Sequence, residues 1–475
     1  MFQLKDYPFV YFIGIGGIGM SGLAQFLRSQ GHQVFGYDKA ESTLVSKLQQ
    51  QGIGIHHDDL VTSIPTIIHN NPDQTLIIYT PAITIYNNAI LNHLTTNHYL
   101  LKSRAAVLGA ICQKHPTLAV AGTHGKTTTS AMISHILYQS NIPICSFIGG
   151  IIETYDTNLL HNCLLEEVEW VIAEADEFNK SFLSLQPTHS IITTVDADHT
   201  DTYPTLADME KNFLQFMAQT THSLLIQDSV AHKLQIKSSC TIPLHTYGLN
   251  EGDIRASHLT LQPDQSRFTY VGPQLSIADL CLPMAGLHNI ENALAAITFC
   301  LAIGLSERAI AQAIASFPGI GRRFSLVFKN DRCVYLDDYA HHPTEIDCLL
   351  TSVKKIYPTS TILAVFQPHL FSRTLAFYPS FAASLSLADQ LVLLPIYPAR
   401  EVAIPNVTSK MIFNSLTCKT KELVTMDSLL DRLTSYVTHS RDHLVIVTIG
   451  AGDIGEKVTA IADTLQRCYA KSVSI

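Results

Sequence analysis

One pattern recurs along the chain and constrains its fold: a short apolar run, a loop of small or polar residues, then apolar residues at helical spacing. Val10–Ile13, Thr117–Ala121 and Leu444–Ile449 are among the apolar runs. Because strands buried on both faces read as continuous apolar runs, the pattern predicts mostly parallel sheets covered by helices. Ligands of such sheets bind beyond the carboxyl ends of the strands, so the polar residues after each run are candidate site residues.

The length of the chain and two breaks in this pattern predict its domains. At 475 residues the chain is too long for one compact core, and roughly 150 residues per domain gives three domains. Tyr99–Arg104 separates the first glycine-rich unit from the second, and Phe317–Gly321 is typical of a linker. The breaks predict three α/β domains, over residues 1–103, 104–318 and 319–475. Ser238–Gln274 has little helical pattern and is expected to be a β-rich insertion.

Composition and charge exclude several classes of protein. Lys and Arg number 31 against 40 Asp and Glu, and the net charge of −9 argues against a general binder of nucleic acid or anionic membranes. No apolar run approaches the roughly 18 residues of a membrane span, and the N-terminal residues lack a signal-type segment. The 10 cysteines include no CxxC pair, which favours reduced thiols. We expect a cytoplasmic protein without membrane insertion or nucleic-acid partner, either a monomer or a weak homodimer.

The first glycine-rich loop indicates a site for a nucleotide diphosphate. Residues 14–19 read Gly-Ile-Gly-Gly-Ile-Gly between a predicted strand and a predicted helix, which matches G-x-G-x-x-G. Such glycines let the backbone approach a diphosphate, to which the helix N-terminus offers N–H donors. Asp38 follows a second apolar run at the distance expected of a ribose-binding acid. These residues alone do not distinguish NAD from a UDP-sugar, and a tight turn without ligand is the alternative.

The second glycine-rich loop is the strongest signal in the chain. Residues 121–129 read Ala-Gly-Thr-His-Gly-Lys-Thr-Thr-Thr, again between a predicted strand and a predicted helix. Backbone N–H groups of such a loop cradle phosphates, while Lys126 would reach the β- and γ-phosphates and the Thr127 hydroxyl would ligate Mg²⁺. Two residues separate Gly122 from Gly125, where the standard motif has four, so the match is to a shortened variant.

Acidic residues follow the next two predicted strands. Glu174, the first residue of Glu-Ala-Asp-Glu, is the preferred Mg²⁺ ligand, because this ion takes oxygen ligands. Asp176 and Glu177 are open to a second interpretation, as acids that favour the start of a helix. His199 ends the segment Asp-Ala-Asp-His and is a candidate for a second metal ion or for contact with the γ-phosphate.

Four later segments are rich in polar side chains. His288 and Asn292 lie at helical spacing and could contact one ligand, while Asn289 could simply cap the helix. Gly-Arg-Arg-Phe at 321–324 could direct an arginine to a phosphate, or form an exposed pair. Residues 337–345 and 366–374 are dense in donors and acceptors, and their histidines lack the spacing of a zinc site.

Together these segments resemble the Mur ligase family of peptidoglycan synthesis. The matching motifs are GIGGIGMSG at 14–22, AGTHGKTTT at 121–129, EADE at 174–177, DADH at 196–199, HNxxNALAA at 288–296, GRRF at 321–324, DDYxHHPTE at 337–345, FQPH at 366–369, YPARE at 397–401 and GAGD at 450–453. They run in family order over essentially the whole chain. The chain departs from the family pattern at Leu370, at Phe178-Asn179 and at Thr80-Pro81.

The resemblance implies a fold and a set of site residues. The fold has a Rossmann-like UDP-substrate domain, a central P-loop ATPase domain with a mostly parallel sheet, and a C-terminal Rossmann-like domain. ATP would contact Gly122, Thr123, His124, Gly125, Lys126, Thr127, Thr128, His288, Asn289, Asn292, Arg323 and Asp338. The UDP substrate would contact Gly14, Gly16, Gly17, Gly19, Asp38, Tyr339 and His369. Mg²⁺ would be held by Thr127, Glu174 and His199, and catalytic roles fall to Lys126, His199, Arg323, His341 and Arg373.

The reaction that the resemblance implies is ATP-dependent addition of L-alanine to the lactyl carboxylate of UDP-N-acetylmuramate, through an acyl phosphate. A recycling ligase of the same family, which adds a tripeptide to UDP-N-acetylmuramate, is an alternative. An NAD(P)-dependent oxidoreductase is suggested only by residues 14–19 and Asp38, and the second phosphate loop argues against it. A nucleotide sensor without catalysis is disfavoured because Lys126, Thr127, Glu174 and His199 are all present.

Overall fold

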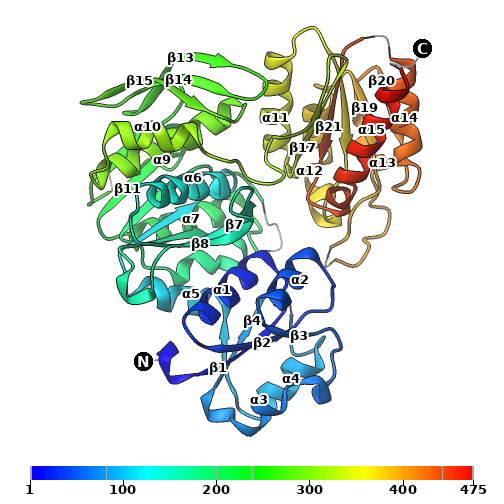
Figure 1. Ribbon diagram of the computed structural model, residues 1–475. Helices are drawn as coiled ribbons and strands as arrows, with labels where there is room; N and C mark the ends of the chain where they lie inside the picture. Colours follow the sequence, from blue (N-terminus) through cyan, green and yellow to red (C-terminus); the bar gives the residue numbers. More distant parts are fainter. Residues whose placement is uncertain are drawn as a thin grey trace. The chain divides into compact units, whose positions relative to one another are not determined.

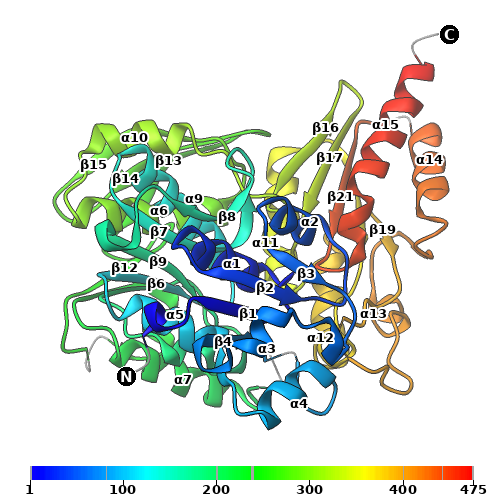
Figure 2. The same ribbon diagram turned by 60° about the horizontal axis from the view of Figure 1, so that its bottom comes forward.

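The computed structural model describes residues 3–81, 83–198, 202–236, 240–399, 401–440 and 442–472. The chain divides into two compact units. The first unit comprises Met1–Val195, Ala207–Tyr247 and Ala295–Ala313, and the second comprises Asp196–Leu206, Gly248–Leu294 and Ile314–Ile475. Figures 1 and 2 show the sheets of each unit and the helices that flank them.

The first sheet is parallel and ends in the first glycine-rich loop. Its strands lie in the order β3-β2-β1-β4-β5 and are β1 (Phe9–Ile13), β2 (Gln33–Tyr37), β3 (Gly54–His56), β4 (Thr75–Tyr79) and β5 (Leu100–Ser103). One face is covered by α1 (Ile18–Ser29) and α2 (Thr43–Gln50), and the other by α3 (Thr66–Asn70) and α4 (Ala89–Thr96) (Figure 1). Because β1 leads directly into α1, the loop between them opens at the carboxyl edge of the sheet.

The second sheet also belongs to the first unit and carries the second glycine-rich loop. Its order is β12-β11-β10-β6-β9-β7-β8, with only β8 antiparallel to its neighbour among the described strands. The strands are β6 (Thr117–Ala121), β7 (Ile144–Ile152), β8 (Thr157–His161), β9 (Trp170–Ala175), β10 (His189–Ile192), β11 (Ser223–Gln227) and β12 (Leu244–Tyr247). The accompanying helices of this unit are α5 (Arg104–Cys112), α6 (Lys126–Gln139), α7 (Leu206–Ala218) and α8 (Asp228–Lys233). Of α9 (Leu287–Ala302) and α10 (Glu307–Ala315), the unit includes the residues from Ala295 to Ala313.

Two sheets belong to the second unit. A three-stranded antiparallel sheet is formed by β13 (Arg255–Leu261), β14 (Ser266–Val271) and β15 (Ser276–Leu282). The six-stranded sheet has the order β16-β17-β21-β18-β19-β20. Its strands are β16 (Ser325–Lys329), β17 (Cys333–Asp338), β18 (Thr361–Phe366), β19 (Gln390–Leu393), β20 (Thr420–Leu423) and β21 (Leu444–Ile449), all parallel except β16. Its helices are α11 (Pro343–Ile356), α12 (Phe371–Leu385), α13 (Lys410–Ser415), α14 (Leu429–His439) and α15 (Val458–Ser472).

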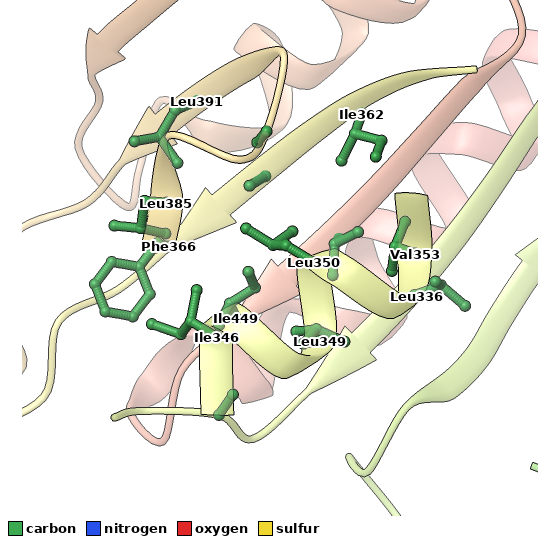
Figure 3. Close-up of a cluster of buried hydrophobic side chains, with 14 of the residues drawn as sticks. Leu336, Ile346, Leu349, Leu350, Val353, Ile362, Phe366, Leu385, Leu391 and Ile449 are labelled. Carbon is green, nitrogen blue, oxygen red and sulfur yellow. The ribbon is translucent and has the colours of Figure 1, made fainter. Parts of the chain in front are cut away.

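The six-stranded sheet shows why the apolar pattern predicts these elements. In α11, Ile346, Leu349, Leu350 and Val353 share one face and are at most 1% exposed. Figure 3 shows this face packed against residues of β17, β18 and β21. Burying each such side chain contributes about 1.5–3 kcal/mol. Pro343 begins the helix, where its missing N–H costs no hydrogen bond, as the sequence predicts.

Three details of the expected strands differ from the structure. β9 continues through Glu174 to Ala175, and β17 includes Asp337 and Asp338, so these acids lie within strands rather than after them. β10 ends at Ile192, so residues 193–195 separate it from the acidic segment that begins at Asp196. In the expected β-rich segment 238–274, β13 and β14 form the antiparallel sheet with the later β15, whereas β12 joins the large sheet. Residues 237–239 lie outside the described part of the chain.

A buried histidine anchors the helix that follows the second glycine-rich loop. His135 of α6 is 2% exposed; its Nδ1 lies 2.8 Å from the Tyr155 hydroxyl and its Nε2 lies 3.0 Å from the Ala313 carbonyl oxygen. The neutral ring satisfies both contacts, by donating from Nε2 and accepting at Nδ1. Burial lowers the pKa of His135 to about 4, against the backbone hydrogen bond to Ala313, which raises it.

This histidine is expected to make the stability of the first unit depend on pH. Between pH 6.5 and about 4 the unfolded chain binds a proton at His135 and the folded chain does not, so stability falls as the pH falls. The slope contributed is about 1.4 kcal/mol per pH unit at most. Calorimetric unfolding at pH 7.5 and pH 5 measures it. His135→Gln is expected to flatten the dependence, and an equally steep profile in that variant would assign the effect to other groups.

Candidate active site

The second glycine-rich loop is held in place by the residues that follow β10. The Thr123 N–H donates to the Thr194 carbonyl at 2.9 Å, and the His124 N–H donates to the Thr194 hydroxyl at 2.8 Å. Gly122 and Gly125 adopt φ of 142° and 82°, which favours glycine. α6 begins at Lys126, so its first-turn N–H groups are available to an anion at the loop.

Gly122→Ala is expected to distort this loop. A methyl group there would collide with the Thr193 hydroxyl and would lie 2.8 Å from the Thr194 backbone nitrogen, and the backbone itself is left-handed. Such strain costs on the order of 1–3 kcal/mol. We expect a higher KM for ATP and a lower melting temperature, measured by nucleotide titration and calorimetry. Gly304→Ala is a matched control, because Gly304 also has a positive φ but no atom lies near its added methyl. Equal effects of the two variants on ATP would contradict the prediction.

Lys126 forms a buried ion pair with a residue far from it in the sequence. Its Nζ donates to Glu177 Oε2 at 2.7 Å and also contacts the carbonyls of Gly122 and Thr123. The side chains of Lys126 and Glu177 are 15% and 1% exposed. Burial alone lowers the pKa of Lys126, but the carboxylates of Glu177 and Asp176 outweigh it and raise the pKa. Lys126 is therefore a fixed positive charge at the loop, and Glu177 is its partner. Glu177 is also the residue directly before the 3₁₀ helix Phe178–Ser184, so the two interpretations of this acid do not exclude each other.

Thr127 and Glu174 bring together the oxygen atoms expected of a magnesium site. The Thr127 hydroxyl lies 3.1 Å from Glu174 Oε2. The other carboxylate oxygen, Oε1, accepts the N–H of Gly149, which orients Glu174 toward the loop. A hydroxyl and a carboxylate beside a phosphate loop match the preference of Mg²⁺ for few protein ligands. No group of three or more His, Cys, Asp or Glu that could hold a metal occurs among the described residues, and His199 lies outside them.

The first glycine-rich loop is closed by Asp38. One carboxylate oxygen accepts the Gly16 N–H at 2.7 Å, and the other accepts the Ala40 N–H at 3.0 Å. Gly14 has φ 82°, and Gly17 is the residue before α1. Asp38 therefore lies at the loop, with both oxygens engaged by backbone groups. Gly19 lies in the first turn of α1, where Arg104 contacts it.

In the second unit, Arg373 and the segment before His199 are joined. Arg373 donates from Nε and Nη2 to Asp198 at 3.0 and 2.9 Å, and the two side chains are 6% and 5% exposed. His342 caps α11. Its Nε2 lies 3.0 Å from the carbonyl oxygen of Ala197, the residue before Asp198. His369 Nδ1 lies 3.4 Å from Arg373 Nη1. Arg373, predicted to face the substrate, thus has a buried carboxylate as its partner.

A second group of predicted residues gathers around Glu345 in the second unit. Arg323 lies 3.6 Å and His341 3.5 Å from its carboxylate. Burial, together with the charge of Arg323, lowers the pKa of His288 to about 4. Burial also lowers the pKa of His341 to about 4, opposed by the charge of Glu345. At neutral pH both imidazoles are therefore neutral beside a charged guanidinium.

Asp338, at the end of β17, accepts the Phe324 and Ala340 N–H groups, each at 2.7 Å. Burial raises its pKa to about 6, against the opposing charge of Arg323. These bonds fix the backbone beside Arg323. The Asp338 carboxylate therefore positions the backbone on either side of the site, at Phe324 and at Ala340.

Aromatic rings line the carboxyl edge of the six-stranded sheet. The ring of Tyr339 lies 5.5 Å from His341, which lies 6.0 Å from His369, which stacks at 5.7 Å on Tyr397. The guanidinium of Arg323 lies 5.3 Å from the Tyr339 ring, a cation–π distance. The strand ends thus bring Tyr339, His341 and His369 into one row, which the separate motifs could not show.

The asparagines at the start of α9 engage mainly the protein itself. Asn289 Nδ2 donates to the Ala285 carbonyl at 2.7 Å, and Asn292 Nδ2 lies 3.5 Å from Asn289 Oδ1. Both are buried, whereas Nδ1 of His288 has no hydrogen-bond partner among the described residues. Thr128, also predicted to contact ATP, is buried in the first turn of α6.

Comparison with known proteins assigns the chain to a family. Three family models match in succession: the Mur ligase family catalytic domain over residues 9–116, the Mur ligase middle domain over 120–300, and the Mur ligase glutamate ligase domain over 322–452. These matches cover most of the chain, and it belongs to the Mur ligase family. The resemblance seen in the motifs and the predicted α/β fold class are both confirmed.

Individual members of the family are similar to this chain over nearly its whole length. A UDP-N-acetylmuramate–L-alanine ligase of Flavobacterium johnsoniae is 41% identical over 464 residues, which cover 98% of this chain and 99% of the relative. The structure of a UDP-N-acetylmuramate-alanine ligase from Thermotoga maritima matches with a TM-score of 0.78 at 27% identity, over 96% of this chain and 99% of that one. A murein peptide ligase from Psychrobacter arcticus has a TM-score of 0.68 at 22% identity, over 96% and 98%, and shares the fold. Within the described residues, no helix is long and apolar enough to cross a membrane.

Proposed function

We propose that this chain is an ATP-dependent ligase that joins L-alanine to the lactyl carboxylate of UDP-N-acetylmuramate in peptidoglycan precursor synthesis. The observation that carries the proposal is the phosphate loop, in which Glu177 holds Lys126 charged and Glu174 faces Thr127. It occurs in a chain that matches a relative named for this activity over 98% of its length. We further propose three domains with the predicted boundaries, action in the cytoplasm, and a monomer or weak homodimer.

The first chemical step activates a carboxylate, which is a poor electrophile. A lactyl carboxylate oxygen attacks the γ-phosphorus of ATP, the bond to the β-phosphate oxygen breaks, and an acyl phosphate and ADP result. Phosphoryl transfer mainly needs positioning and neutralisation of charge. Lys126 supplies a preorganised positive charge at the loop, because Glu177 fixes its ammonium. We propose that Arg323 approaches the transferred phosphoryl group.

Thr127 and Glu174 fit a magnesium ion and are the residues that would hold it, with His199 proposed at a second ion. When bound, Mg²⁺ would neutralise phosphate charge. Glu174 is oriented for this by the Gly149 N–H. The shortened loop offers its N–H groups to the phosphates from the start of α6.

The second step forms the amide bond. The amine of L-alanine attacks the acyl carbon, and the nitrogen passes a proton to a base, for which His199 and a water are the candidates. The tetrahedral intermediate then expels phosphate and leaves the amide. We propose that Tyr339 and His369 contact the UDP substrate and that His341 lies beside the reacting carboxyl group. A pKa of about 4 leaves His341 neutral at pH 7, so its ring can donate or accept a hydrogen bond without adding charge.

Phosphate release tests the proposed function. ATP, Mg²⁺ and UDP-N-acetylmuramate are supplied with L-alanine, with the L-alanyl-γ-D-glutamyl-diamino-acid tripeptide, or with neither. Release that requires L-alanine supports the proposal. Release only with the tripeptide would assign the recycling reaction, the alternative that a murein peptide ligase of similar fold keeps open. Tight ATP binding without release in any mixture would overturn both.

A further inference from the structure

The first glycine-rich loop has no positively charged side chain of its own for the diphosphate that we propose as its ligand. Residues 14–22 contain no Lys or Arg, and the Asp38 carboxylate lies on the Gly16 N–H. A diphosphate that approaches this loop therefore meets an anion. The helix start of α1 offers about half of one positive charge, which is less than a diphosphate carries. A cation from elsewhere in the chain would complete the site.

Arg104 is a cation that the fold brings to this loop from the start of α5. A Cβ built on Gly19, in the first turn of α1, would lie 2.5 Å from its Nη1 and 3.1 Å from its Cζ. The guanidinium therefore rests directly on the Gly19 backbone, in space that any larger residue would fill. Arg104 follows β5, which ends at Ser103 two strands from the glycine loop in the sheet order.

The other end of this guanidinium is fixed. Arg104 Nη2 donates to Asp176 Oδ2 at 3.1 Å, and the Asp176 side chain in turn accepts the Phe178 N–H at 3.1 Å. The side chains of Arg104 and Asp176 are 20% and 37% exposed, so the pair is accessible to a ligand. Asp176 is the neighbour of Glu177, the partner of Lys126. One acidic motif thus positions a cation at each of the two glycine-rich loops.

We infer that Arg104 is a substrate-binding residue that contacts the diphosphate of the UDP substrate, with Asp176 as its positioning residue. The inference rests on the proposed function, because it takes the nucleotide sugar as the ligand of the first loop. Planar guanidinium groups form paired hydrogen bonds with phosphate oxygens that lysine cannot reproduce. Gly19 is then needed as glycine to leave room for the guanidinium.

Steady-state kinetics and binding test the inference. Arg104→Ala is expected to raise KM for UDP-N-acetylmuramate roughly 10- to 100-fold, the range of one charge-assisted contact, with KM for ATP nearly unchanged. Arg104→Lys is expected to recover only part of the loss. Arg28→Ala is the matched control, because Arg28 also lies against a glycine, Gly52, but at the far end of α1. An unchanged KM in Arg104→Ala would overturn the inference.

Binding of UDP and of uridine, measured by calorimetry without turnover, separates a diphosphate contact from a structural role. Arg104→Ala is expected to weaken UDP and leave uridine unchanged, and equal weakening of both would overturn the inference. Gly19→Ala is expected to weaken UDP in the parent and to add little in Arg104→Ala. Failure of the parent to release phosphate would count against the proposed function, whereas the comparison of UDP with uridine would still decide the role of Arg104.

Discussion

Replacing Lys126 with alanine is expected to lower phosphate release by roughly 10²- to 10³-fold, the effect of removing one preorganised charge from a phosphoryl-transfer site. The ammonium is fixed by Glu177 at 2.7 Å and by the carbonyls of the loop, so its charge needs no rearrangement during the reaction. UDP-substrate affinity is expected to survive, because the first glycine-rich loop lies on a different sheet. Phosphate release and UDP binding, measured on the same preparation, check both parts.

Two variants control this experiment. Lys47→Ala removes another lysine of the first unit, one that pairs with Asp156 at the surface, and is expected to leave turnover unchanged. Glu177→Gln keeps the lysine but removes the nearest of the carboxylates that raise its pKa, so the pKa of Lys126 is expected to be lower than in the parent. As the pH is raised, Lys126 of that variant should lose its charge earlier, so turnover should begin to decline at a lower pH than in the parent. If Lys126→Ala lost UDP binding together with turnover, the prediction that ATP and the UDP substrate bind at separate loops would be wrong.

The sequence predicts those parts of the molecule that depend on local spacing. The apolar face of α11 and the strand β6, with Lys126 at the start of the following helix, lie where the pattern puts them. Exact strand ends are less predictable, because hydrogen bonding to neighbours carries β9 through Glu174 and β17 through Asp338. An apolar run stops at the first polar residue, whereas a strand stops where its partner does.

Partners between distant residues could not be predicted from spacing. Glu177 lies 51 residues from Lys126, and nothing local distinguishes it from Asp176 as a helix-start acid. Arg104 carried no motif at all, and only the packing on Gly19 points to it. Its place at the end of the break Tyr99–Arg104 gave no sign that the residue lies directly after a strand of the first sheet.

Breaking the pair of Arg373 and Asp198 is expected to cost about 3–5 kcal/mol of unfolding free energy, because each alanine variant leaves one buried charge without its counter-charge. Arg373 was predicted to face the substrate, yet two of its nitrogens donate to this carboxylate and both side chains are buried. Its expected role is to hold Asp198, the residue directly before His199. Calorimetry of the full-length protein measures the loss as a lower melting temperature in each variant than in the parent.

A double-mutant cycle distinguishes this role from substrate binding. Arg373→Met and Asp198→Leu each leave one buried charge without its partner, and the double variant removes both charges. The double variant is expected to recover much of the stability that each of these single variants loses, since the desolvation cost disappears with the pair. Arg373→Lys is expected to remain destabilised, because an ammonium cannot reproduce the two guanidinium hydrogen bonds. If Arg373→Ala instead unfolds like the parent and raises only KM for UDP-N-acetylmuramate, Arg373 faces the substrate during turnover and the pair with Asp198 is dispensable.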